Sequence, residues 1–176
     1  GANQNWYFGH GLAGALYSDE GTAPLAGKTI SVSRNGGAAL ASAETGENGA
    51  YAINGVAMTG GSILTLYVDD ETEDAVTVLL GSGSAMAGIN LYQNRLIVRS
   101  ESGSVAVTNA HLGAGAANGD SDISALYSVA GGNLSVAADK ELMVWTGDTF
   151  TPGGTVTATD YDINGTMTLG ANAFTV

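Results

Sequence analysis

The chain has 176 residues, with 5 Lys and Arg against 17 Asp and Glu, a formal net charge of −12 and no cysteine. This balance argues against nucleic acid and anionic membrane surfaces as partners, because binding either needs a basic stripe that five scattered cations do not form. Without cysteine, disulfides, thiolate metal sites and a cysteine nucleophile are excluded. The 27 glycines, 2 prolines and 44% hydrophobic residues are typical of a folded, turn-rich β protein.

The first half of the chain alternates short apolar segments with turn residues. Residues 13–17, 28–33 and 38–43 are predicted strands, because Gly, Asn, Asp or Glu cluster after each of them. Residues 50–53 form a further predicted strand between two Asn-Gly pairs. Asn-Gly favours a hairpin, since a type I′ turn needs positive φ at both central residues.

Two of these segments carry a family resemblance. The order Pro-Leu-Ala-Gly-x-Thr-Ile-x-Val at 24–32, followed by Glu-Asn-Gly-Ala-Tyr-x-Ile-x-Gly-Val at 47–56, resembles the carboxypeptidase regulatory-like (transthyretin-like) β-sandwich. The resemblance covers about residues 11–80. This family is a non-catalytic module of bacterial surface and secreted proteins, so the resemblance implies a scaffold rather than an enzyme.

The next predicted strands are 63–68 and 75–80, separated by the acidic run 69–74. Residues 75–94 are free of charge for long enough to cross a membrane. The Gly-Ser-Gly-Ser sequence at 81–84 interrupts them, so the segment is predicted to be strand, turn and strand, with no membrane insertion. Alternation along these strands predicts a core containing Tyr51, Ile53, Ile63, Leu66, Val68, Val76 and Val78.

The second half shows no sustained helical period. Strands are predicted within 89–100 and at Val105 and Val107, and the small residues 113–119 are interpreted as a flexible boundary. Beyond it, short strands recur about every ten residues, and residues 130–176 resemble the strand-turn repeats of bacterial cell-surface β-solenoid proteins. The predicted fold class is therefore all-β, with a β-sandwich at 1–85 followed by a second β-sandwich or short β-solenoid at 86–176.

No residue is nominated for catalysis. His10 and His111 are far apart in the sequence and neither has the spacing of a metal-ligand pair. The Gly-Lys-Thr sequence at 27–29 lacks the glycines of a phosphate loop and opens a strand. The sequence therefore predicts a protein that is not an enzyme and has no cofactor.

Calcium is the one ligand with candidate residues. The acidic turn offers five carboxylates within six residues, and Ca²⁺ prefers six to eight hard oxygens. The alternative, and the preferred interpretation, is a solvated hairpin tip whose charges discourage edge-to-edge aggregation. The candidate calcium ligands are Asp69, Asp70, Glu71, Glu73 and Asp74.

We expect a non-enzymatic structural protein, extracellular or on the cell surface, in a bacterial filament, stalk or adhesin. The alternative is a carbohydrate-binding module, because such modules present Trp and Tyr rings that stack on sugars. Trp6, Tyr7, Trp145 and Tyr161 are available for stacking, although Trp145 lies in an apolar segment, as a core residue would.

The ends of the chain predict assembly. Trp6, Tyr7 and Phe8 begin near the first residue, and Phe174 and Val176 end the sequence within a predicted strand. An exposed strand edge is a template for pairing. We therefore expect a head-to-tail homopolymer, or pairing with another cell-surface protein. A chain excised from a longer protein would end in the same way.

Overall fold

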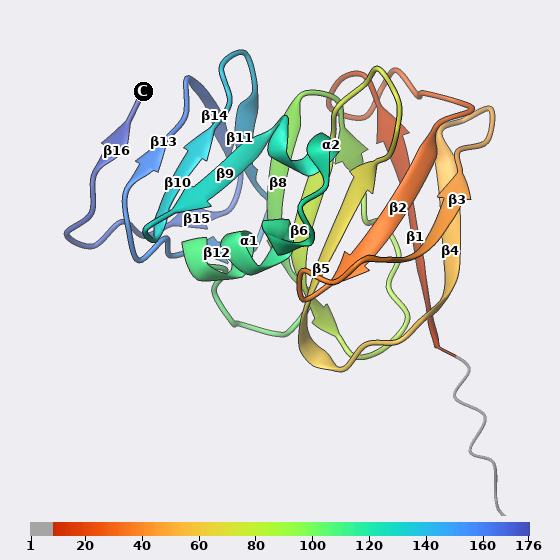
Figure 1. Ribbon diagram of the computed structural model, residues 1–176, viewed down its shortest axis with the longest axis horizontal. Coiled ribbons are helices and arrows are strands. Elements are labelled where there is room, and N and C mark those ends of the chain that lie inside the picture. The colour runs from red at the N-terminus through yellow and green to blue at the C-terminus, as the bar shows by residue number, and fades with distance from the viewer. Residues whose placement is uncertain (1–8) are drawn as a thin grey trace, which may run out of the picture.

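The computed structural model describes residues 9–176 (Figure 1), so the predicted assembly residues Trp6, Tyr7 and Phe8 lie outside the described residues. Strands account for 46% of the chain and helices for 8%, which confirms the all-β prediction. The strands form one large sheet and three smaller ones.

One of the smaller sheets is three-stranded, with the order β4-β1-β7. β1 and β4 are antiparallel, and β1 and β7 are parallel. Of the two predicted Asn-Gly turns, the one at 48–49 precedes β4, whereas the pair at 54–55 lies inside β4 and forms no turn, so that prediction is wrong. Gly49 and Gly55 adopt positive φ, but Asn48 and Asn54 do not, so neither pair forms the predicted type I′ turn. The bounds are β1 His10–Tyr17, β4 Ala50–Val56 and β7 Leu91–Tyr92.

The large sheet is seven-stranded, with the order β14-β11-β8-β6-β5-β2-β3. Neighbours are antiparallel from β3 to β6 and parallel from β6 to β14. The predicted boundary after residue 85 falls between β6 and β7, and this sheet takes strands from both sides of it. The bounds are β2 Thr29–Arg34, β3 Ala39–Glu44, β5 Gly60–Val68, β6 Val76–Ser82, β8 Arg95–Ser100, β11 Glu141–Val144 and β14 Asp160–Ile163.

A first core fills the space between these two sheets. Alternation along β5 directs Leu64, Leu66 and Val68 into this core, and β6 adds Leu79. Ile63 points to the other face of the sheet, where it is half-buried and packs against a second core. The other predicted core residues are buried: Tyr51, Ile53, Leu66, Val68, Val76 and Val78.

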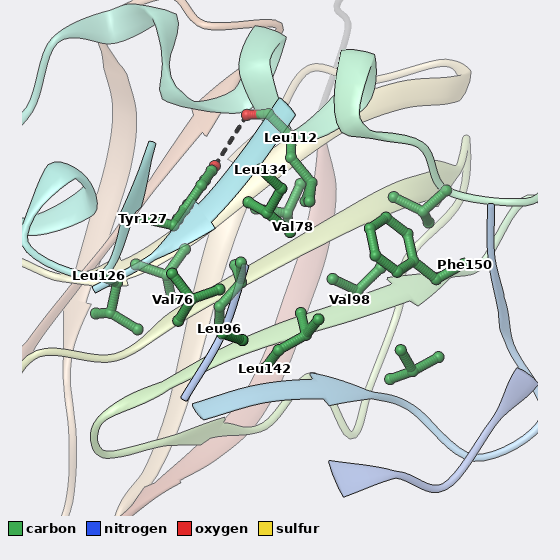
Figure 2. Close-up of a cluster of buried hydrophobic side chains, with 14 of the residues drawn as sticks. Val76, Val78, Leu96, Val98, Leu112, Leu126, Tyr127, Leu134, Leu142 and Phe150 are labelled. Carbon is green, nitrogen blue, oxygen red and sulfur yellow. Dashed lines mark hydrogen bonds between the residues drawn. The ribbon is translucent and has the colours of Figure 1, made fainter. Parts of the chain in front are cut away.

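A second core covers the opposite face of β5, β6, β8 and β11 (Figure 2). The sheet contributes Val78 and Val98 to this core. The helix at 109–115 contributes Leu112, and the strand at 127–130 contributes Tyr127. The Tyr127 hydroxyl donates a hydrogen bond of 3.0 Å to the Leu112 carbonyl oxygen, which satisfies a buried polar group. The central strands are therefore apolar on both faces.

Residues 113–119, predicted to be a flexible boundary, form helical structure instead. Thr108 caps the first helix in a capping box with His111, and the Thr65 hydroxyl donates a hydrogen bond of 3.2 Å to the carbonyl of Gly115. Small residues allow this close approach to β5, and tertiary contacts rather than periodicity stabilise such short helices. The bounds are α1 Asn109–Gly115, the 3₁₀ helix η1 Ala116–Asn118 and α2 Ser121–Ser124.

From β8 onward the chain makes three successive circuits, which we call the three-coil region (residues 95–176). Each circuit adds one segment to each of three parallel ladders: β8-β11-β14, Val107-β12-β15 and β10-β13-β16. The first circuit also contains the helices and β9, which pairs with β10 in antiparallel fashion. The bounds are β9 Tyr127–Ala130, β10 Asn133–Val136, β12 Thr149–Phe150, β13 Val156–Thr157, β15 Thr166–Met167 and β16 Phe174–Thr175.

Glycine allows successive circuits to approach closely at their corners. A Cβ atom on Gly154 would lie 2.2 Å from the carbonyl oxygen of Gly132, and one on Gly165 would lie 2.3 Å from that of Trp145. Backbone packs on backbone at both places. Val105, predicted to be in a strand with Val107, is exposed, and Val107 makes a single bridge to Phe150.

Replacing Leu66 with Ala should lower the free energy of unfolding by about 2–5 kcal/mol, because a fully buried leucine leaves a cavity. Leu40→Ala on the edge strand β3 is the matched control, because Leu40 is 47% exposed and its truncation should change stability by less than about 0.5 kcal/mol. Urea unfolding followed by circular dichroism measures both. Equal losses in the two variants would contradict this placement of the core.

The His111 side chain makes folding stability dependent on pH. Its Nδ1 accepts a hydrogen bond of 3.2 Å from the Thr108 backbone N–H, and burial lowers the pKa of His111. Because folding lowers the pKa of His111, the neutral imidazole stabilises the folded state at pH values above its unfolded pKa of about 6.5. This stabilisation is lost as the pH falls, because the unfolded chain then binds the proton more readily than the folded chain. His111→Gln, which suits a capping box, should therefore show a smaller fall in melting temperature between about pH 7 and pH 5. Superimposable profiles for the two proteins would rule this role out.

Candidate functional site

The last circuit of the three-coil region leaves three strand edges unpaired within the described residues. β14, β15 and β16 are each the final strand of a parallel ladder. β16 and the C-terminus lie at the far left of Figure 1, at the end of the three-coil region away from β3. Backbone groups on such edges are a template for adding another strand.

The side chains inside the last circuit are far less covered than their register partners in the circuit before it. Leu142, Phe150 and Val156 are fully buried. Their partners, in the same order, are Tyr161, which is 48% exposed, and the half-buried Met167 and Phe174. We call this surface the open end and define it as Tyr161, Ile163, Met167 and Phe174.

The predicted assembly residues at the C-terminus belong to this surface or lie beside it. Phe174 contacts Tyr161 edge to face, with ring centroids 5.0 Å apart. This pair covers part of the core and leaves the rest of both rings accessible. Val176, which follows β16, is 70% exposed. The sequence predicted both residues to lie in a terminal strand; Phe174 begins β16 and Val176 follows it. It did not predict that Tyr161 and Met167 lie on the same surface.

The acidic turn does not gather its five carboxylates into one site. Lys28 Nζ lies 2.5 Å from Glu73 Oε2 and 3.4 Å from Glu71 Oε2. Asp74 is bound 2.7 Å from Lys140 Nζ. These ion pairs direct three of the five candidates towards lysines, so the predicted set does not converge on one cation.

Asp69 instead joins two carboxylates from a distant segment. Oxygens of Asp69, Asp120 and Asp122 lie within 4.8 Å of one another, and all three residues are half-buried. Asp122 accepts a hydrogen bond of 2.8 Å from the Asp70 backbone N–H, and the Ser31 hydroxyl donates to Asp69. Burial raises the pKa of Asp122, and the charges on Asp120 and Asp69 raise it further. Like-charged groups are therefore held together here at a cost in stability.

The remaining candidates do not form a reactive group. In the described part of the chain, neither His10 nor His111 belongs to a cluster of metal-ligating side chains. The Arg99 guanidinium lies 4.9 Å from the Trp145 ring centroid, and Tyr92 packs 6.1 Å from the same ring. Trp145 is half-buried by these contacts. Its role in stacking on a sugar stays a prediction, and Trp6 and Tyr7 lie outside the described residues.

The comparisons with known proteins do not assign a class. No family model, curated protein or solved structure matches the chain. Within residues 9–176 there is also no helix with both the length and the apolar composition needed to cross a membrane.

Replacing Asp122 with Asn tests the carboxylate cluster. A carboxyl group whose pKa is raised by folding destabilises the protein when charged, so Asp122→Asn should raise the melting temperature at pH 7, with a smaller gain near pH 4. Glu47→Gln, in an exposed turn, is the control and should have little effect.

The parent protein and Asp122→Asn test calcium binding by differential scanning fluorimetry with millimolar calcium or a chelator. A ligand bound only by the native state would raise the melting temperature by mass action. We expect the same melting temperature in both buffers, as for a solvated turn. A calcium-dependent rise in the parent protein that is lost in Asp122→Asn would contradict that expectation.

Proposed function

We propose that this chain is a non-enzymatic structural subunit that assembles through β-strand pairing, in an extracellular filament, stalk or adhesin. One observation carries the proposal: apolar side chains that are buried in the second circuit have half-exposed counterparts in the third. Exposed apolar surface next to unpaired strand edges is typical of an interaction site. An added strand would satisfy the free backbone groups and cover Tyr161 and Phe174.

We propose the segment around Trp6, Tyr7 and Phe8 of a second copy as the added strand. This segment is aromatic, and residues 1–9 carry no charged side chain. The acceptor edge β14 carries Asp160 and Asp162, so an acidic donor strand would be repelled. A donor at one end and an acceptor at the other make a heterologous contact, which forms filaments when it does not close on itself.

The two resemblances stay proposals for the two halves of the chain. Two sheets enclose the first core, as in a carboxypeptidase regulatory-like sandwich, and we propose this module for the first half. The three parallel ladders have the strand order of stacked coils, and we propose a short β-solenoid for residues 95–176. A coil cannot bury its apolar face without a neighbour, which gives a physical reason for assembly at the open end.

Two variants separate the donor from the acceptor. Removal of residues 1–8 and the substitution Tyr161→Asp should each abolish polymerisation, measured by light scattering after size exclusion and by negative-stain microscopy. Mixing the two variants should give a 1:1 dimer, because the deletion variant retains the acceptor edge and Tyr161→Asp retains the donor segment. Leu40→Asp is the matched control, since it places the same charge on the other edge of the large sheet and should still polymerise.

Circular dichroism confirms that each variant is folded before its assembly is scored. A parent protein that stays monomeric at high concentration with both ends intact would refute the proposal. So would a Leu40→Asp variant that fails to assemble while Tyr161→Asp still polymerises, because the contact would then lie at β3.

A further inference from the structure

A polar cleft of about 490 Å³ lies where three parallel strands of the large sheet begin. Arg95, Glu141 and Asp160 are the first residues of β8, β11 and β14, and they are direct neighbours in the register of the ladder. Their side chains project from the face opposite the second core, because Leu96 and Leu142 occupy that core. The turns before these strands and the segment after β1 complete the walls.

The polar groups of the cleft are held in place before any ligand binds. Arg95 Nε lies 2.8 Å from Glu141 Oε2, and Arg95 Nη2 lies 3.1 Å from Glu20 Oε1. Lys140 Nζ donates 2.7 Å hydrogen bonds to Asp74 Oδ2 and to Asn94 Oδ1. Side chains fixed in this way lose little conformational freedom on binding.

Two residues of the cleft also have constrained backbones. Asn94 and Asp139 adopt positive φ of 62° and 60°, a conformation that favours glycine. Asn94 is fixed there by backbone hydrogen bonds in both directions: its N–H donates to the Asp74 carbonyl, and its carbonyl accepts from Glu141 N–H. Such residues cluster at functional sites, where the surrounding structure maintains the strain.

The charge distribution limits the class of ligand. Asp139, Glu141 and Asp160 line the cleft with only Arg95 and Lys140 as cations, and the chain carries −12 overall, so an anion would be repelled. Carboxylate oxygens of Glu20, Glu141 and Asp162 lie within 4.8 Å of one another beside the cleft. A metal ion there would have to compete with the Arg95 guanidinium, which forms ion pairs with Glu20 and Glu141. A ligand with many neutral hydroxyl groups can both donate to the carboxylates and accept from the amides.

We propose that this cleft binds a neutral carbohydrate of one or two sugar rings through hydrogen bonds to Gln93, Asn94, Asp139, Glu141 and Asp160. The volume suits a small saccharide, and the mixture of planar amides, carboxylates and hydroxyls matches sugar hydroxyl groups. No aromatic ring lines this cleft, so stacking does not contribute and the Kd is on the order of 1 mM. The cleft shares strand β14 with the open end, but its side chains project from the opposite face of the sheet.

Saturation-transfer difference NMR of the full chain tests the proposal, because it observes the sugar and works at any assembly size. The probes are glucose, galactose, mannose, N-acetylglucosamine, maltose and lactose. At least one should receive saturation, with a titration that reaches a plateau. Asn94→Gly keeps the positive φ and removes the amide that faces the cleft, so it should weaken binding at least tenfold.

Asn35→Gly is the matched control, since Asn35 also adopts positive φ but lies in the turn between β2 and β3, and it should bind as the parent does. Absence of saturation transfer to every probe would overturn the proposal. Equal binding by Asn94→Gly and the parent would place the sugar elsewhere and overturn it too. Calcium chloride serves as a further probe, and a rise in the parent's melting temperature with calcium that Asn94→Gly lacks would assign the cleft to a cation instead.

Discussion

The structure depends on a sheet whose central strands are buried on both faces. β5 and β6 present Leu66 and Leu79 to the first core, and Tyr67 and Val78 to the second. Strands covered on both sides need apolar residues at nearly every position, and β6 has them at Val76, Val78, Leu79 and Leu80. The buried Thr77 between them donates a hydrogen bond of 2.8 Å to the Asn90 carbonyl. Because the two cores share this sheet, a change in its register would disturb both at once.

The large sheet changes from antiparallel to parallel pairing where β6 meets β8, and the three-coil region begins at β8. Up to β6 the large sheet grows by antiparallel neighbours, and after it the chain leaves and returns before each new strand. Each return adds a circuit that covers the apolar interior of the one before. In the third circuit the interior is partly uncovered at Tyr161 and Phe174.

Sequence reasoning located most strands because their signals are local: alternation at residues 63–68 and the turn at 48–49 need no knowledge of distant partners. It did not find what depends on long-range pairing. Asp69 meets Asp122 only because α2 packs near the end of β5, and Arg95, Glu141 and Asp160 line one cleft only through parallel register. The helix at 109–115 was missed because small residues gave no apolar stripe, although Thr108 and His111 carry its cap.

The central claim is that the strand edges of the last circuit are free in the monomer and paired in the proposed assembly. Amide hydrogen exchange measured by mass spectrometry, in dilute and in concentrated protein, tests this claim most directly. Amides of β14, β15 and β16 should exchange rapidly when dilute and become protected as concentration rises, while those of β6 stay protected throughout, because buried central strands open only with global unfolding. Edges that keep exchanging rapidly in assembled material would contradict the account.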